Sequence, residues 1–327
     1  RRAVAGTPVQ CAEFVPALVT TEAGDVSGLS YQLIQSMATF VESAEADLRA
    51  DFRGVMIDRA RFDAALVARA EKSGAVCRFG VVLTGIGDDG VVRLSDGSDV
   101  RPRLLIGADG PRSLVARRAG FPAQDVAESR QMTVGLVAPM RSTDIFLSSE
   151  IVGGYGWLFP KGDRANLGVG VARSERHHLK TLLDSLHRRL ADEGRVGRDV
   201  FGYTGGAIPV GGLVGPVGAI GSLPVLLAGD AAGLANPVTG AGINSAVISG
   251  VMAGEAAAKS LEAGASALAD FGDDMTDLFK GALDRALNHR RRLVRIGRRS
   301  TPDDLRGGWI AYDAYWDGNE NKKEAAE

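Results

Sequence analysis

The sequence predicts an α/β fold in which one ligand-binding unit is split by an inserted antiparallel sheet and followed by a helical C-terminal region. In two stretches, 104–120 and 223–262, an apolar strand ends in glycine and aspartate and leads into a helix. The strand-rich stretch 126–209 lies between them and predicts the insertion. We therefore expect three parts with these boundaries: a split domain at 1–125 and 210–262, a sheet domain at 126–209, and a helical region at 263–327.

The composition is that of a soluble globular protein. The 327 residues carry a net charge of −2, so the charge balance argues against a nucleic-acid partner. Two cysteines and the absence of an apolar run of ~18 residues predict a cytoplasmic protein without a membrane span. Glycine is unusually frequent, at 43 of 327 residues, about 13% against a usual ~7%. This frequency suggests close approach of the backbone to other backbone or to a ligand.

The other elements follow from hydrophobic periodicity and turn signals. Phe62, Leu66 and Ala70 recur at helical spacing, which predicts a helix from Asp58 to about Gly74. The tripeptides DDG and SDG then predict hairpins. The remaining predicted elements, in chain order, are strands within 132–171, a charged helix at 174–193, glycine-rich strand at 202–222, a helix to about 262, and basic helix within 268–316.

The stretch VLLAGDAAGLANPVTGAGINSA places Asp230 at the end of a buried strand. An acid at this position can accept hydrogen bonds from the hydroxyls of a sugar-like ligand. Gly240, Gly242 and Asn244 open the following helix, whose free N–H groups suit an anion or an electron-rich ring edge. An ordinary strand–loop–helix, with Asp230 as a capping residue, is the alternative.

The stretch LLIGADGPRSLVARRAG repeats the pattern with Asp109 and Gly110. A plain turn into a helix would explain either stretch alone, but two of them imply one extended ligand. IGADGPRS resembles the Asp-Gly motif of the flavin hydroxylase-type FAD fold, and LLAGDAAGLANPVTGAGI resembles its Gly-Asp motif. The resemblance implies a Rossmann-like FAD-binding domain with these cofactor-binding residues: Asp109, Gly110, Gly229, Asp230, Gly240, Ala241, Gly242, Ile243 and Asn244.

A third stretch, GYGWLFPKGDRANLGVG, resembles the YxWxFPx7GxG pattern of the geranylgeranyl reductase family. From the residues alone, the aromatic stripe is either ordinary core or an apolar wall suited to an isoprenoid chain. The resemblance implies the wall and these substrate-binding residues: Tyr155, Trp157, Phe159, Pro160, Gly168 and Gly170.

The N-terminal GTPVQCAEF is similar to a Pro-x-x-Cys segment of archaeal-type prenyl reductases. The resemblance implies that Cys11 lies near the flavin ring in a catalytic role, and that Arg1 and Arg2 bind the adenosine end. It also places Arg59, in DRARFDAAL, near the cofactor. A buried, inert thiol at Cys11 and a surface salt bridge at Arg59 are the alternatives.

The sequence departs from the family pattern in two places. The βαβ unit with G-x-G-x-x-G is expected before residue 1, so we expect the N-terminal βαβ of the FAD domain to be missing from this chain. Ala241 stands where the family usually has glutamate, in TGAGI.

These features predict a FAD-dependent oxidoreductase that saturates C=C bonds of an isoprenoid chain by hydride transfer. The external electron donor would be NAD(P)H or a ferredoxin-like protein. A flavin monooxygenase or halogenase of the same fold is an alternative, as is a non-catalytic protein that binds an apolar ligand. We expect no metal site, because His177 and His178 lie on a charged helix without a spaced partner. The basic cluster 289–299 is either a peripheral membrane contact or a solvated face.

Overall fold

The computed structural model describes residues 3–16, 27–264 and 266–317, and the chain divides into two compact units. Each unit is described by itself. Unit 1 comprises Arg1–Tyr31, Ile57–Val126 and Ile208–Asp284, and unit 2 comprises Gln32–Met56, Ala127–Ala207 and Arg285–Glu327. None of the helices among the described residues is long and apolar enough to cross a lipid bilayer.

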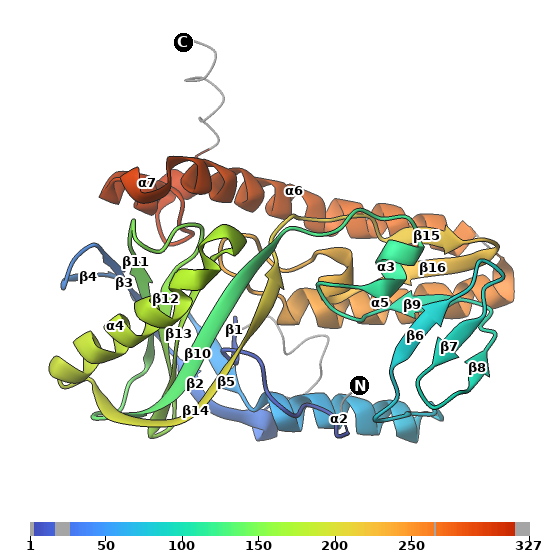
Figure 1. Cartoon of the computed structure of the whole chain (residues 1–327), viewed down its shortest axis with the longest axis horizontal. Coiled ribbons are helices and arrows are strands. Elements are labelled where there is room, and N and C mark those ends of the chain that lie inside the picture. Colours follow the sequence, from blue (N-terminus) through green and yellow to red (C-terminus); the bar gives the residue numbers. More distant parts are fainter. Residues whose placement is uncertain (1–2, 17–26, 265, 318–327) are drawn as a thin grey trace, which may run out of the picture. The chain divides into compact units, whose positions relative to one another are not determined.

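Unit 1 is built on two small sheets with helices. One sheet has the order β15-β16-β9 and the other the order β6-β7-β8. The elements of unit 1 are α2 (Arg59–Lys72), β6 (Leu83–Ile86), β7 (Val92–Leu94), β8 (Asp99–Val100), β9 (Leu105–Gly107), α3 (Leu114–Arg118), β15 (Val217–Ile220), β16 (Leu223–Leu227), the 3-10 turn η4 (Gly229–Ala232), α5 (Ile243–Ala263) and most of α6 (Ser266–Ile296) (Figure 1).

The core of unit 1 forms around β16. Val225, Leu226 and Leu227 are fully buried and share one hydrophobic cluster with Ala253 of α5 and Met275 of α6. A continuous apolar run of this kind is typical of a strand buried on both faces. The core therefore fixes the strand whose end carries Asp230.

Of three further strands, the first lies in unit 1 and the other two have residues in both units. They are β1 (Phe14–Pro16), β2 (Ser30–Ile34), which follows the 3-10 turn η2 (Ser27–Leu29), and β5 (Gly54–Ile57). They form a sheet in the order β1-β5-β2.

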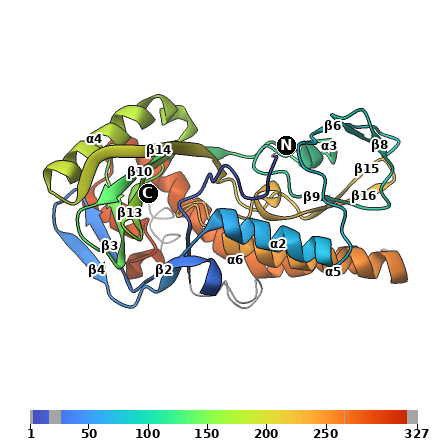
Figure 2. The ribbon, with the colours of Figure 1, turned by 90° about the horizontal axis from the view of Figure 1, so that it is seen from below.

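Unit 2 is a seven-stranded sheet in the order β14-β10-β13-β12-β11-β3-β4, with one helix on one face. Its elements are β3 (Ser36–Val41), β4 (Ala46–Arg49), β10 (Val126–Leu136), β11 (Ser142–Leu147), β12 (Gly156–Lys161), β13 (Arg164–Ala172), the 3-10 turn η3 (Arg173–His178), α4 (Leu179–Asp192), β14 (Val196–Pro209), the end of α6, η5 (Gly297–Arg299), α7 (Pro302–Gly307) and η6 (Asp313–Tyr315). Figure 2 shows β14 running beside β10 at the edge of this sheet.

Helix α4 covers one face of the sheet with a leucine stripe. Leu183, Leu186 and Leu190 are buried and belong to one cluster with Leu158 of β12 and Leu167 of β13. The leucines at helical spacing thus determine which side of the charged helix predicted at 174–193 packs on the sheet.

The units differ from the expected domain boundaries at two places. Residues 36–41, which carry no strong strand signal, form β3 and pair with β11 from Ser36↔Ser142 to Val41↔Leu147. This pair is parallel, so the expected antiparallel sheet is in fact mixed. Residues from Arg285 onward belong to unit 2 rather than to a separate helical region, and α6 runs across this division.

Candidate functional site

The ends of β9 and β16 lie side by side in unit 1. The two strands are parallel, with Leu105 opposite Val225 and Gly107 opposite Leu227. Asp109 and Asp230 follow these strands, so both acids leave the sheet at the same edge. In open α/β sheets this edge is where ligands bind.

The carboxylate of Asp109 is engaged by the helix that follows it. It accepts hydrogen bonds from Ser113 Oγ at 2.5 Å, Leu114 N at 2.7 Å and Val115 N at 3.2 Å. Gly110 supplies the left-handed turn between Asp109 and the helix, with a φ of 87°. A turn into a helix accounts for these bonds, and a role of Asp109 in cofactor binding stays a prediction.

The carboxylate of Asp230 differs from that of Asp109. Within the described part of the chain, no hydrogen bond to its oxygens is found, and the group is half-buried. It lies against the start of α5, since a Cβ at Gly242 would be 3.4 Å from Asp230 Oδ1. Burial raises the pKa of the Asp230 carboxyl above its usual range, and the positive charge of Arg59 opposes this rise. Asp230 does not cap α5, because the capping position is Gly242 and has no side-chain capping bond.

The loop before α5 makes hydrogen bonds within itself and does not cap the first N–H groups of the helix. Asn236 N donates to Ala241 O at 2.8 Å, and Gly240 N donates to Asn236 O at 2.8 Å. The first helical bond runs from Ala246 N to Gly242 O, so the N–H groups before Ala246 have no carbonyl within the helix. Asn244 Oδ1 is buried and has no hydrogen-bond partner in the described residues.

Cys11, Arg59 and Asp230 are brought together in unit 1. The Arg59 guanidinium binds both oxygens of Asp63 at 3.0 and 3.1 Å, and it also contacts the Cys11 thiol. Arg59 N donates to Glu13 Oε1 at 3.1 Å. Burial raises the pKa of the Cys11 thiol, and Arg59 opposes this rise. Cys11 is therefore a protonated thiol at neutral pH.

We name Cys11, Arg59, Asp230 and residues 240–244 the Asp230 site. Its polar groups fit the flavin part of FAD: an unpartnered carboxylate, a buried amide oxygen and a helix start with free N–H groups. Hydroxyl groups of a ribityl chain would donate to the acid, and a ring edge that accepts hydrogen bonds would meet the helix. Arg1 and Arg2, expected at the adenosine end, lie outside the described residues.

The predicted substrate-binding residues lie in unit 2. Tyr155 stands just before β12, and Trp157 and Phe159 follow at the two-residue spacing of one strand face. The ring centroids of Tyr155 and Trp157 are 5.7 Å apart, and those of Trp157 and Phe159 are 6.4 Å apart. Trp309 extends this aromatic row, with its ring centroid 4.8 Å from that of Tyr155.

The motif glycine Gly168 makes room for Trp157, whereas a side chain at Gly170 would meet the ring only at ordinary contact distance. Gly168 is the cross-strand partner of Trp157, and a Cβ at Gly168 would lie 2.2 Å from the indole ring. A Cβ at Gly170 would lie 3.7 Å from the same ring. The indole Nε1 donates to Gln131 Oε1 at 3.0 Å, so Trp157 is held by both packing and a hydrogen bond. Pro160 alternates with Phe159 on β12 and belongs to the opposite face of the strand.

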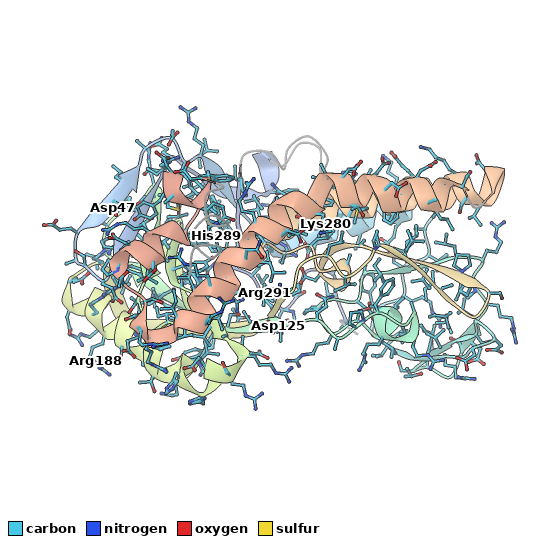
Figure 3. All side chains as sticks on the ribbon, turned by 90° about the horizontal axis from the view of Figure 1, so that it is seen from above. Asp47, Asp125, Arg188, Lys280, His289 and Arg291 are labelled. Atoms are coloured by element: carbon cyan, nitrogen blue, oxygen red, sulfur yellow. The ribbon has the colours of Figure 1, made fainter. Side chains whose placement is uncertain are left out.

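The structure gives His177, His178 and the basic cluster local roles. The two histidine rings lie 4.0 Å apart, and no group of metal-binding residues is found in the described part of the chain. In the basic cluster, Arg292 pairs with Asp304 at 2.8 Å and Arg298 with Glu175 at 2.7 Å. Figure 3 labels His289 and Arg291 on α6 in this cluster. The expected membrane contact of this cluster stays a prediction.

Comparison with known proteins identifies the family. Residues 129–206, which include the motif part of the aromatic row, match the geranylgeranyl reductase catalytic domain. The chain is 32% identical over 287 residues to the digeranylgeranylglycerophospholipid reductase of Methanoculleus marisnigri, covering 81% of this chain and 70% of that protein. It is 34% identical over 289 residues to reductase 1 of Methanopyrus kandleri, covering 80% and 73%.

The chain belongs to the geranylgeranyl reductase family. The resemblance of the motif GYGWLFPKGDRANLGVG is thereby confirmed. As a member of this family, the protein is a flavoprotein oxidoreductase that acts on CH–CH groups.

Solved structures agree on the fold. A geranylgeranyl bacteriochlorophyll reductase-like protein of Thermoplasma acidophilum matches with a TM-score of 0.84 at 22% identity, covering 99% of this chain and 89% of that one. A probable FAD-dependent monooxygenase of Pseudomonas aeruginosa matches with a TM-score of 0.64 at 21% identity, covering 93% and 91%. The reductase-like protein and the probable monooxygenase therefore share this mixed α/β fold.

Sequence reasoning missed three residues around the predicted ones. Gln131 binds the Trp157 indole and Trp309 extends the aromatic row, but both come from segments far from β12 in sequence. No local pattern indicates either contact. Asp63 is different, since it lies four residues after Arg59 on the predicted helix, and this spacing is a known signal for an ion pair.

Proposed function

We propose that the protein is a FAD-dependent reductase that saturates the C=C bonds of a geranylgeranyl-type isoprenoid chain. The observation that carries this proposal is the aromatic row, whose motif residues Tyr155, Trp157 and Phe159 lie in the segment matching the family's catalytic domain. The named relatives are digeranylgeranylglycerophospholipid reductases, so an isoprenoid chain on a glycerophospholipid is the substrate we favour.

The Asp230 site of unit 1 holds the flavin in this proposal. Asp230 would accept a hydrogen bond from a hydroxyl of the bound cofactor, and the open start of α5 would stabilise negative charge on it. Reduced FAD, once bound, supplies the hydride that goes to one carbon of the double bond. The external donor that reduces FAD is NAD(P)H or a ferredoxin-like protein.

Cys11 is the candidate proton donor. Addition of a hydride to one alkene carbon requires a proton at the other, and a thiol whose pKa is raised by burial retains its proton at neutral pH. Arg59 lies beside the sulfur, so its positive charge would stabilise the thiolate left after transfer. Reprotonation from solvent then restores the thiol.

The aromatic row of unit 2 binds the isoprenoid chain. Aromatic faces pack well on an apolar polyene. Trp157 is held by Gln131 and packs against Gly168, so its ring is already ordered before a substrate binds.

The second candidate is a monooxygenase, because a probable FAD-dependent monooxygenase shares the fold. Mass spectrometry of the product separates the two. A reductase adds two hydrogens per double bond under anaerobic conditions with chemically reduced flavin. A monooxygenase requires O2 and adds one oxygen atom. A product that contains oxygen, with no hydrogenated product under anaerobic conditions, would reject the proposal.

A further inference from the structure

Unit 2 contains an open pocket of about 380 Å³ on the face of the sheet that α4 covers. It lies between β10, β14, the turn η3 and the first turn of α4. Its volume is within the range of small-molecule sites, roughly 300–1,000 Å³. The pocket lies apart from the residues of the aromatic row, none of which lines it.

The pocket lining is basic. Arg130, Arg176 and Lys180 contribute three positive charges, His177 contributes an imidazole ring, and none of the described residues that line the pocket is acidic. Arg176 and Lys180 lie on consecutive turns at the η3–α4 junction, and Arg130 comes from β10. Because the cations come from separate elements, the fold itself concentrates positive charge at this point.

The hydrogen-bonding capacity of these cations is incompletely used. Arg130 Nε is buried and has no hydrogen-bond partner in the described residues. The Arg130 guanidinium lies over the Tyr203 ring, 5.5 Å from its centroid. This cation–π contact holds the guanidinium beside the pocket. For the Arg176 side chain, the described part of the chain shows no hydrogen bond or ion pair. Lys180 pairs with Asp184 at 2.5 Å on its own helix.

A solvated basic face would leave each cation in water with its own counter-ion. The buried Nε of Arg130 does not fit that description, because an unpartnered buried donor costs free energy. A tetrahedral anion with several acceptor oxygens would satisfy it and would relieve repulsion among the three cations. The planar fork of arginine matches phosphate oxygens in two-point hydrogen bonding.

We propose that this pocket, formed by Arg130, Arg176, Lys180 and Tyr203, binds the phosphate group of a phosphate ester. Two sources share this chemistry: a phosphate ester free in solution and the headgroup of a lipid in a bilayer. The proposal concerns charge recognition and does not depend on flavin chemistry.

Calorimetric titration of the full-length protein with inorganic phosphate and with glycerol phosphate, at constant ionic strength, tests the site. We expect Arg176→Gln and Arg130→Gln each to weaken binding about tenfold, since a charge-assisted hydrogen bond contributes roughly this much. Arg176 is exposed, so its replacement leaves folding unchanged even if Arg130→Gln does not. Arg188→Gln is the matched control: Arg188 is exposed on α4, outside the pocket, and is labelled in Figure 3.

Sedimentation with vesicles distinguishes the two sources. Vesicles of phosphatidylcholine alone are compared with vesicles that also contain phosphatidylglycerol. Binding of soluble phosphate that Arg176→Gln weakens supports a site for free esters. Binding only to the anionic vesicles, again weakened by Arg176→Gln, supports a lipid headgroup. The proposal is rejected if neither probe binds, or if Arg188→Gln weakens binding as much as Arg176→Gln.

Discussion

Trp157 lies opposite Gly168 across the β12–β13 ladder, and its indole ring occupies the space where a side chain at position 168 would be. The spacing between the aromatic residues and the glycines of the family motif thus has a packing reason. The glycine lets a large ring lie flat on its neighbouring strand, and Gln131 fixes the polar edge of that ring.

Replacing Gly168 by alanine tests this packing directly. The added methyl group would lie 2.2 Å from the indole ring, so the ring must move. We expect the free energy of unfolding to fall by about 1–3 kcal/mol, as for other overpacked sites, and the tryptophan fluorescence to shift. Denaturant unfolding measures both.

Gly202→Ala is the control for that variant. Gly202 is exposed on β14, and a Cβ there meets nothing within 4 Å. Its replacement should leave stability unchanged or slightly raised. Equal stability of the two variants would contradict the packing argument.

A buried ion pair in unit 2 gives a second prediction. Asp144 is only 2% exposed, and Arg195 pairs with its carboxylate. Burial raises the pKa of Asp144, and Arg195 opposes that rise. Arg195→Met leaves the acid unpaired, so we expect a loss of about 3–5 kcal/mol in the free energy of unfolding at neutral pH.

The decrease in the free energy of unfolding caused by Arg195→Met should depend on pH. Without Arg195, the pKa of Asp144 in the folded state rises further above that in the unfolded state. The folded state then binds the proton more tightly, and stability falls as pH rises through this window. Thermal unfolding at mildly acidic pH should therefore show a smaller deficit than at neutral pH. The double variant Asp144→Asn/Arg195→Met should recover much of the stability, and a pH-independent deficit would contradict the argument.

Asp230→Asn should stabilise the flavin-free protein while weakening flavin binding. The pKa of the Asp230 carboxyl is raised in the folded state. At pH values above the usual pKa of aspartate, ionisation of this group therefore lowers the free energy of unfolding. We expect a gain on the order of 1 kcal/mol at neutral pH that shrinks on acidification, and about tenfold weaker binding of FAD. Thermal unfolding and FAD titration measure the two effects.

Asp109→Asn provides the contrast in stability. Its carboxylate accepts hydrogen bonds from Ser113, Leu114 and Val115 at the start of α3, so the substitution should cost about 1 kcal/mol. If both substitutions destabilise the flavin-free protein equally, Asp230 is a structural residue like Asp109.

Cys11→Ala tests proton donation. If the thiol supplies the proton, turnover should fall roughly 100-fold or more, while the flavin remains bound. Cys77→Ala is the matched control, because Cys77 is a half-buried free cysteine outside the Asp230 site. A steady-state assay with a flavin absorbance spectrum of each variant measures both properties. Unchanged turnover in Cys11→Ala would leave the thiol without a catalytic role.

The sequence could predict what depends on local pattern. Asp109 and Asp230 both follow apolar strands, and the parallel pairing of β9 and β16 does place them at one sheet edge. The same local pattern could not tell the two acids apart. The helix after Asp109 begins at once and draws its carboxylate to the free N–H groups. The helix α5 begins only beyond a closed loop, and no hydrogen bond to the Asp230 carboxylate is found among the described residues.

Contacts between distant segments could not be predicted in this way. The pairing of β3 with β11 and the contact of Tyr155 with Trp309 join segments that are more than 100 residues apart. Their strand and helix signals carry no information about partners, because pairing register is set by the whole sheet. The division into units therefore differs from the boundaries expected from the sequence, whereas the family motif is a local pattern and could be identified.

Anaerobic reoxidation of the flavin tests the central claim most directly. The full-length protein, loaded with FAD and reduced with dithionite, is mixed with a geranylgeranyl-bearing glycerophospholipid in the absence of oxygen. The account predicts that the absorbance of oxidised flavin returns and that saturated product forms, one double bond for each flavin reoxidised. Flavin that stays reduced in the presence of the lipid, or protein that binds no FAD at all, would contradict it.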